Sequence, residues 1–162
     1  MDKIYKPLTG DEIINWIPEV NLMKYKEFKN YKELPRLPIV VLYEIKENFG
    51  HWVLIFNSPE GIEHFDSYGY IPDDEFEFIP KKYKTPITGQ DNKYLLKLLS
   101  KRDDVNYNQY KFQDEGPYAT CGRWAILRYL FRDLTIDQFY KMIKKSADQL
   151  DLSFDELVAL AI

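Results

Sequence analysis

Three residues of this chain carry the side chains of a cysteine nucleophile and of the groups that activate it. Cys121 is the single cysteine in the sequence and stands directly before a long apolar run. His51 and Asp66 lie upstream, among β-branched and aromatic residues. In such sites a thiolate attacks a carbonyl carbon, an imidazole moves the proton and a carboxylate orients the imidazole. These residue types predict acyl-transfer chemistry.

Two short strands are expected to bring His51 and Asp66 together. The runs 51–56 and 62–66 are separated by turn residues at 57–61, a pattern typical of an antiparallel hairpin. Such pairing puts the start of the first strand beside the end of the second. The carboxylate can then orient the imidazole. The other histidine, His64, is expected to be structural or exposed.

The nucleophile is expected at the start of a buried helix. The run from Gly122 to Phe131 is apolar around most of its circumference. The positive end of that helix favours a thiolate, as does a nearby imidazolium. Binding of the oxyanion needs N–H donors, for which the backbone of Cys121 and the side-chain amide of Gln113 are the candidates.

The remaining pattern predicts one α+β domain over residues 1–162, with a small, mainly antiparallel sheet flanked by helices. Runs at 39–45, 51–56 and 62–66 indicate a meander, and 105–112 another strand. Residues 19–38 read as a short helix and a loop, 67–74 as a turn and 75–88 as irregular chain. Helices are expected at 9–17, 90–100 and 121–131, and after the capping residues Thr135 with Gln138 and Ser153 with Glu156.

Composition excludes several classes of protein. The formal net charge of −4 does not indicate a nucleic-acid-binding protein. A single cysteine cannot form an internal disulfide, which favours a reducing compartment. The start of the chain lacks an apolar signal region, and no stretch approaches the about 18 apolar residues that a membrane span needs. One cysteine and two histidines make no recognisable zinc cluster, and no phosphate-binding loop is present.

Three motifs, taken together and in order, resemble a known family. They are Gly50-His51-Trp52, then Phe65-Asp66-Ser67-Tyr68-Gly69, then Gln113, Gly116-Pro117 and Cys121-Gly122. This order resembles the adenain-like and SUMO-protease-like cysteine peptidases, above all the small maturation proteases of large DNA viruses, virophages and related elements. The resemblance covers roughly residues 39–132.

The resemblance implies a thiol protease with a papain-like or adenain-like core and no cofactor or metal. His51 would be the general base, Asp66 its orienter, Cys121 the nucleophile and Gln113 the oxyanion donor, with Trp52 beside the substrate cleft. Peptides would be hydrolysed through a thioester at small, glycine-rich sites of virion capsid or core precursors. The implied place of action is the host cytoplasm, a virus factory or the virion, without secretion, and a monomer suffices.

Two departures from the family qualify the resemblance. The glutamine lies further from the cysteine than is usual, which keeps Gln109 as the alternative to Gln113. The lone cysteine excludes a disulfide-linked activating peptide, and the acidic balance argues against activation by DNA. Alternative functions are a SUMO-type isopeptidase, an acyltransferase using the same thiol, and a non-catalytic relative that binds a structural or ubiquitin-like protein.

Overall fold

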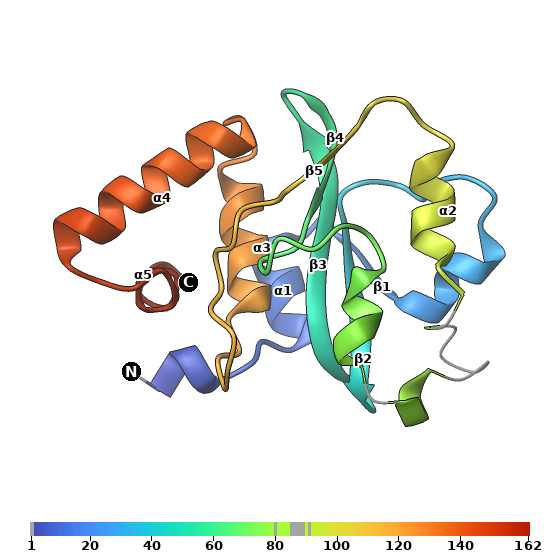
Figure 1. Cartoon of the computed structure of the whole chain (residues 1–162), viewed down its shortest axis with the longest axis horizontal. Coiled ribbons are helices and arrows are strands. Elements are labelled where there is room, and N and C mark those ends of the chain that lie inside the picture. The colour runs from blue at the N-terminus through green and yellow to red at the C-terminus, as the bar shows by residue number, and fades with distance from the viewer. Residues whose placement is uncertain (1, 80, 85–89, 91) are drawn as a thin grey trace.

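A central sheet separates two helical layers (Figure 1). The computed structural model describes residues 2–79, 81–84, 90 and 92–162. The sheet has five strands in the order β1-β2-β3-β4-β5. Their bounds are β1 Asn21–Lys24, β2 Ile39–Lys46, β3 Phe49–Ser58, β4 Gly61–Phe65 and β5 Val105–Tyr107. The α+β class and the flanking helices agree with the prediction.

The sheet is mixed rather than mainly antiparallel. Strands β2, β3 and β4 form the expected antiparallel meander. The outer strands β1 and β5 each pair in parallel with their neighbour. Strand β1 falls within 19–38, where a helix and a loop were expected, and β5 is shorter than the predicted strand 105–112. Four residues without polar alternation give no strand signal of their own, and β1 is held by its ladder to β2.

The first helical layer covers one face of the sheet and contains the predicted nucleophile helix. It consists of α1 (Gly10–Trp16), α3 (Cys121–Leu130), α4 (Ile136–Leu150) and α5 (Phe154–Ala161), with the one-turn η1 (Asp2–Tyr5) beside α5. The capping boxes expected before α1, α4 and α5 are all formed. Each cap satisfies backbone donors that a helix start leaves unpaired, which fixes where the helix begins.

The second layer packs on the opposite face (Figure 1). It contains η2 (Tyr25–Asn30), η3 (Asp74–Phe78), η4 (Lys81–Tyr83) and α2 (Tyr94–Ser100). Helix α2 begins four residues later than the predicted helix 90–100. The irregular stretch predicted at 75–88 forms short 3-10 turns where it is described, and part of it lies outside the described residues. None of the helices described is long and apolar enough to cross a membrane.

Helix α3 is anchored to the sheet by a buried ion pair. Every residue from Cys121 to Tyr129 is buried, including Arg128, which is fully enclosed. The guanidinium of Arg128 donates two hydrogen bonds to the carboxylate of Glu63 on β4, at 2.8 and 2.9 Å. Removing one partner of such a pair leaves an uncompensated buried charge. The contact therefore fixes the helix, and with it Cys121, relative to the meander.

Candidate active site

The β2–β3 hairpin positions His51 at the edge of a hollow. Gly50 precedes the histidine and pairs with Glu44 across the hairpin. A Cβ atom at position 50 would lie 1.8 Å from the backbone oxygen of Tyr43. Only glycine therefore allows the strands to approach this closely. The imidazole that follows is buried, yet it lines the hollow.

Asp66 and Tyr68 hold the imidazole on its edge and on its face. The distance from His51 Nε2 to Asp66 Oδ1 is 3.1 Å, and Asp66 is fully buried just after β4. The backbone N–H of Tyr68 donates to the same carboxylate oxygen at 2.7 Å. The ring of Tyr68 stacks on the imidazole, with centroids 5.0 Å apart and planes 20° apart. The histidine is thus fixed in one orientation.

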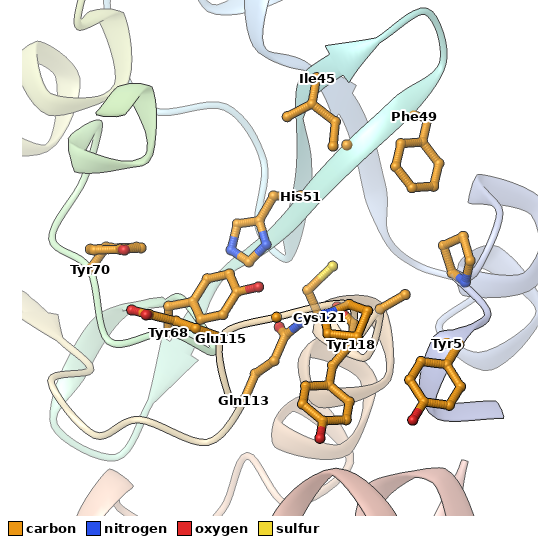
Figure 2. Close-up of a pocket in the computed structure, with 15 residues that line it drawn as sticks. Tyr5, Ile45, Phe49, His51, Tyr68, Tyr70, Gln113, Glu115, Tyr118 and Cys121 are labelled. Atoms are coloured by element: carbon orange, nitrogen blue, oxygen red, sulfur yellow. Dashed lines mark hydrogen bonds between the residues drawn. The ribbon is translucent and has the colours of Figure 1, made fainter. Parts of the chain in front are cut away.

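Cys121 meets the imidazole from the start of α3. Its sulfur accepts a hydrogen bond from the backbone N–H of Trp52 at 3.4 Å and is a hydrogen-bond partner of the His51 side chain. In Figure 2 the imidazole and the thiol point toward one another. Because Nε2 of His51 faces Asp66, Nδ1 is the nitrogen that serves the thiol. The structure therefore brings the three predicted residues together in the order carboxylate, imidazole, thiol.

The charges around His51 favour its protonated form. Burial of the imidazole acts against its charge, but the negative charges of Asp66 and Cys121 outweigh burial and raise the pKa of His51 to about 10. Burial likewise opposes the charge of Asp66, but the neighbouring His51 holds the pKa of that carboxyl below its usual value. The arrangement supports an imidazolium held between Asp66 and Cys121.

Gln113 lines the same hollow, and a backbone carbonyl fixes the orientation of its side-chain amide. Its Nε2 donates to the backbone oxygen of Tyr118 at 3.0 Å, and its Oε1 accepts from the hydroxyl of Ser67 at 2.7 Å. A carbonyl oxygen can only accept, so the nitrogen must face Tyr118. Gln113 and Cys121 line the same hollow, so the second hydrogen on Nε2 and the N–H of Cys121, at the first position of α3, are the candidate donors there.

The hollow has the size of a small-ligand or peptide-binding site, about 590 Å³. Figure 2 shows Tyr68, Tyr70 and Glu115 on one side of Cys121, with Tyr118 and Tyr5 on the other. Part of the wall comes from the start of the chain, at Tyr5 and Pro7. Aromatic walls around a polar centre suit a polypeptide segment. No group of three or more His, Cys, Asp or Glu side chains within the described ranges is arranged to hold a metal ion.

Two of the residues considered from the sequence lie outside this hollow. The indole of Trp52 is directed away and donates from its ring nitrogen to the backbone oxygen of Leu8 at 3.1 Å. It lines two neighbouring hollows instead, while its backbone N–H donates to Cys121. Gln109 is exposed in a separate hollow beside Ile136. Of the two glutamines, Gln113 is the one brought to Cys121.

Sequence reasoning missed the residues that support the site. Ser67 orients Gln113, although its place between Asp66 and Tyr68 suggested only a turn. Asp155 on α5 accepts from the hydroxyl of Thr120 at 2.6 Å and from the backbone N–H of Asp114 at 3.1 Å. It ties the start of α3 to the loop that carries Gln113. In the sequence it reads as an ordinary acidic residue in the first turn of a capped helix.

A virophage protein is similar along most of the chain. The sequence is 37% identical over 143 residues to "Uncharacterized protein V9" of Sputnik virophage, covering 86% of this chain and 81% of the relative. The chain belongs to the family of this virophage protein. The viral source agrees with the prediction of a viral protein. No protein-family model matches the sequence. An activity is therefore inferred from the geometry of the site and from the motifs that resemble cysteine peptidases.

Proposed function

We propose that this member of the V9 family is a cysteine endopeptidase with a papain-like or adenain-like core. The observation that supports it is the position of His51, with one ring nitrogen 3.1 Å from Asp66 and the ring hydrogen-bonded to Cys121 in a single hollow. Base, orienter and nucleophile in contact are the requirement for covalent catalysis of acyl transfer. The roles are nucleophile for Cys121, general acid and base for His51, and orienter for Asp66.

The first half of the reaction forms a thioester. The thiolate of Cys121 attacks the scissile carbonyl carbon, and the negative charge moves to the carbonyl oxygen. The N–H of Cys121 and the amide of Gln113 stabilise that oxyanion. Collapse of the intermediate breaks the C–N bond, and the His51 imidazolium gives its proton to the departing amine. An acyl-enzyme and a neutral imidazole remain.

The second half releases the acid product. His51 takes a proton from water, and the hydroxide formed adds to the thioester carbonyl at the same oxyanion site. Collapse breaks the C–S bond and expels the thiolate, while the proton stays on His51. This restores the starting ion pair. Throughout, Asp66 keeps Nε2 of His51 engaged, so that Nδ1 keeps facing the sulfur.

The proposed substrates are polypeptides with small residues, such as glycine, at the cleaved bond. Because the relative is a virophage protein, the proposed biological role is the processing of virion precursor proteins. This processing would take place in the host cytoplasm, in a virus factory or in the particle itself. This substrate class also follows from the family that the His51, Asp66 and Cys121 motifs resemble.

A peptide library and a thiol electrophile test the proposal together. Purified protein is incubated with glycine-rich peptides beside Cys121→Ala, and products are read by mass spectrometry. We expect cleavage by the wild type and none by the variant. Because the chain has one cysteine, the intact mass after iodoacetamide treatment reports on Cys121 alone. His51→Ala should slow this alkylation near neutral pH, since the imidazolium that favours the thiolate is gone.

The two readouts separate the possible outcomes. Cleavage that persists in Cys121→Ala would contradict the proposal, because the product would come from a contaminant or another residue. No cleavage, together with alkylation that His51→Ala does not change, would show that the thiol is not activated. The protein-binding alternative would then replace the peptidase.

A further inference from the structure

A second histidine and a glutamate are buried directly behind the candidate site. His64 on β4 and Glu75 on η3 are both completely buried, with 3.5 Å between His64 Nε2 and Glu75 Oε1. This contact is longer than a normal hydrogen bond. The carboxyl of Glu75 also contacts that of Asp66, the residue that holds His51. The proposed mechanism uses neither His64 nor Glu75, although burying them is costly.

The contact between the two carboxyls requires a proton. While both groups are ionised, Asp66 Oδ2 and both oxygens of Glu75 have no hydrogen-bond donor among the described residues. Two carboxylates in contact, away from water, cannot both be ionised. One proton shared at this contact removes the repulsion and supplies the missing donor.

The surroundings assign that proton to Glu75. Asp66 Oδ1 already accepts from His51 Nε2 and from the backbone N–H of Tyr68, and both bonds stabilise its anion. The carboxyl of Glu75 has its own backbone N–H nearby, which lowers its pKa by less than burial raises it. Burial, and then the charge of Asp66, raise the pKa of Glu75 well above its usual value. Burial also lowers the pKa of His64 to about 4, so His64 is neutral.

The other titratable groups around Glu75 do not reverse this assignment. They are Tyr43 on β2, Tyr70 in the turn after β4 and Asp73 before η3. The two tyrosines are neutral near pH 7, because burial raises the pKa of each above its usual value. Asp73 is a third acidic group, and its charge opposes ionisation of Glu75 further.

We propose that Glu75 is a protonated positioning residue that donates a hydrogen bond to Asp66 Oδ2 and so fixes the carboxylate that orients His51. The inference rests on the proposed function, because it assigns Glu75 a role in the same reaction. A third hydrogen bond prevents the carboxylate of Asp66 from rotating. It does so without adding a further negative charge near the His51 imidazolium. His64 fills the remaining space as a neutral neighbour.

Infrared difference spectroscopy tests the proton directly, without any activity. The spectrum of Glu75→Gln is subtracted from that of the wild type near pH 7. We expect a C=O band of a protonated carboxylic acid in the difference, well separated from carboxylate bands. Subtraction isolates Glu75 from other buried acids such as Asp155. A carboxylate band in place of the acid band would overturn the proposal.

Two matched variants test the positioning role. Glu75→Gln keeps an N–H donor toward Asp66, whereas Glu75→Leu keeps the bulk and loses the donor. We expect near wild-type kcat for the glutamine variant. For the leucine variant we expect a fall on the order of 10- to 100-fold, the effect of losing one hydrogen bond to a charged group. The acid limb of its pH profile should move to higher pH, because Asp66 loses a donor that stabilises its anion.

A nuclear magnetic resonance measurement separates this inference from the peptidase proposal. The chain has two histidines, so the imidazole signals of labelled protein are simple to assign. The hydrogen-bonded Nε2–H proton of His51 should be protected in wild type and Glu75→Gln, and exchange faster in Glu75→Leu. If Glu75→Leu does not fold, the infrared difference between wild type and Glu75→Gln still tests whether Glu75 carries the proton.

The experiments distinguish failure of the peptidase proposal from failure of the role proposed for Glu75. An acid band with altered His51 exchange, but without cleavage or activated alkylation, would refute the peptidase and leave the role of Glu75 standing. Equal His51 exchange and equal pH profiles in folded Glu75→Gln and Glu75→Leu would refute the positioning role. Peptide cleavage by the wild type would keep the proposed function in that case.

Discussion

At the scale of single residues, the direction of the Gln113 amide depends on one carbonyl. The backbone oxygen of Tyr118 accepts a hydrogen bond from Nε2 of Gln113, and the hydroxyl of Ser67 donates one to Oε1. We predict that Gln113→Ala lowers kcat by about 100- to 1,000-fold with little change in KM, since an oxyanion donor acts mainly in the transition state. Steady-state kinetics on a cleaved peptide measure both constants.

Two further variants serve as controls for Gln113. Ser67→Ala should cause a smaller loss in kcat, because Tyr118 still directs the nitrogen. Gln109→Ala should behave as the wild type, since Gln109 lies in a different hollow. A larger loss of kcat in Gln109→Ala than in Gln113→Ala would mean that Gln109, and not Gln113, is the oxyanion donor.

The elevated pKa of His51 makes stability depend on pH. Its pKa is about 10 in the folded protein against 6.5 for an ordinary histidine. The folded state therefore binds more protons between these values. The stabilisation is complete below about pH 6.5 and is lost as the pH rises through about 10. We predict that unfolding free energy falls with pH in this window, with a slope of at most about 1.4 kcal/mol per pH unit.

Urea unfolding at a series of pH values measures this slope. His51→Gln is the control, because it cannot bind the extra proton. The stability difference between wild type and variant should shrink as pH rises from 6.5 to 10. A constant difference would mean that His51 titrates alike in the folded and unfolded chain.

The sequence predicts the three residues that meet at the candidate site better than the residues that support them. Cys121, His51 and Asp66 have side-chain chemistry that few other functions need, and a short hairpin brings two of them together. Glu75 reaches the site from the 3-10 segment after the turn that follows Asp66, and Asp155 reaches it from the C-terminal helix α5. Acidic residues of that kind are common on surfaces, so only the tertiary contacts distinguish them.

At the scale of elements, α5 holds two segments of the site together through one carboxylate. Asp155 accepts from the hydroxyl of Thr120 and from the backbone N–H of Asp114. We predict that Asp155→Ala lowers the free energy of unfolding by about 2 kcal/mol, because one buried and one partly buried donor lose their acceptor. Urea unfolding measures this loss.

Thr120→Val is the matched variant for the Asp155 cluster. It removes one of the two donors and keeps the bulk, so its loss should be about 1 kcal/mol. The two effects should not add in the double variant, because both remove the same hydrogen bond. Stability of Asp155→Ala equal to wild type would show that water replaces the carboxylate at no cost.

Local signals predicted the elements whose stability is local. Capping boxes gave the starts of α1, α4 and α5, and turn residues gave the β2–β3–β4 meander. Strand β1 was missed because a four-residue segment acquires its strand geometry only by pairing with β2. The parallel outer pairs depend on contacts between segments distant in the sequence, which a residue pattern does not encode.

At the scale of the whole molecule, both ends of the chain meet beside the candidate site. Figure 1 shows the N-terminus and the C-terminal helix α5 on the same side of the sheet, and η1 contacts α5. The backbone N–H of Ala119 donates to the oxygen of Ile4 at 2.7 Å. The ring of Tyr5 stacks on Tyr118, with centroids 5.9 Å apart. The first residues therefore form one wall of the hollow that contains Cys121.

This wall should bind substrate rather than stabilise the fold. The side chain of Tyr5 is 54% exposed, so replacing it with alanine should cost at most about 0.5 kcal/mol of stability. An aromatic contact with a bound peptide contributes about 0.5 to 1.5 kcal/mol, so KM should rise by about two- to tenfold in Tyr5→Ala. Catalysis should be unchanged, because Tyr5 takes no part in the proton transfers between His51 and the substrate or water.

The matched control for the wall is Tyr31→Ala. Tyr31 is exposed to a similar extent, 45%, and follows η2 in the opposite layer. Its removal should leave KM and kcat unchanged. A rise in KM for Tyr5→Ala alone would place part of the peptide against the N-terminal segment. Equal KM values would show that the peptide leaves the hollow on the side of Tyr68 and Tyr70. A fall in kcat would mean that Tyr5 acts through Tyr118 on the amide of Gln113.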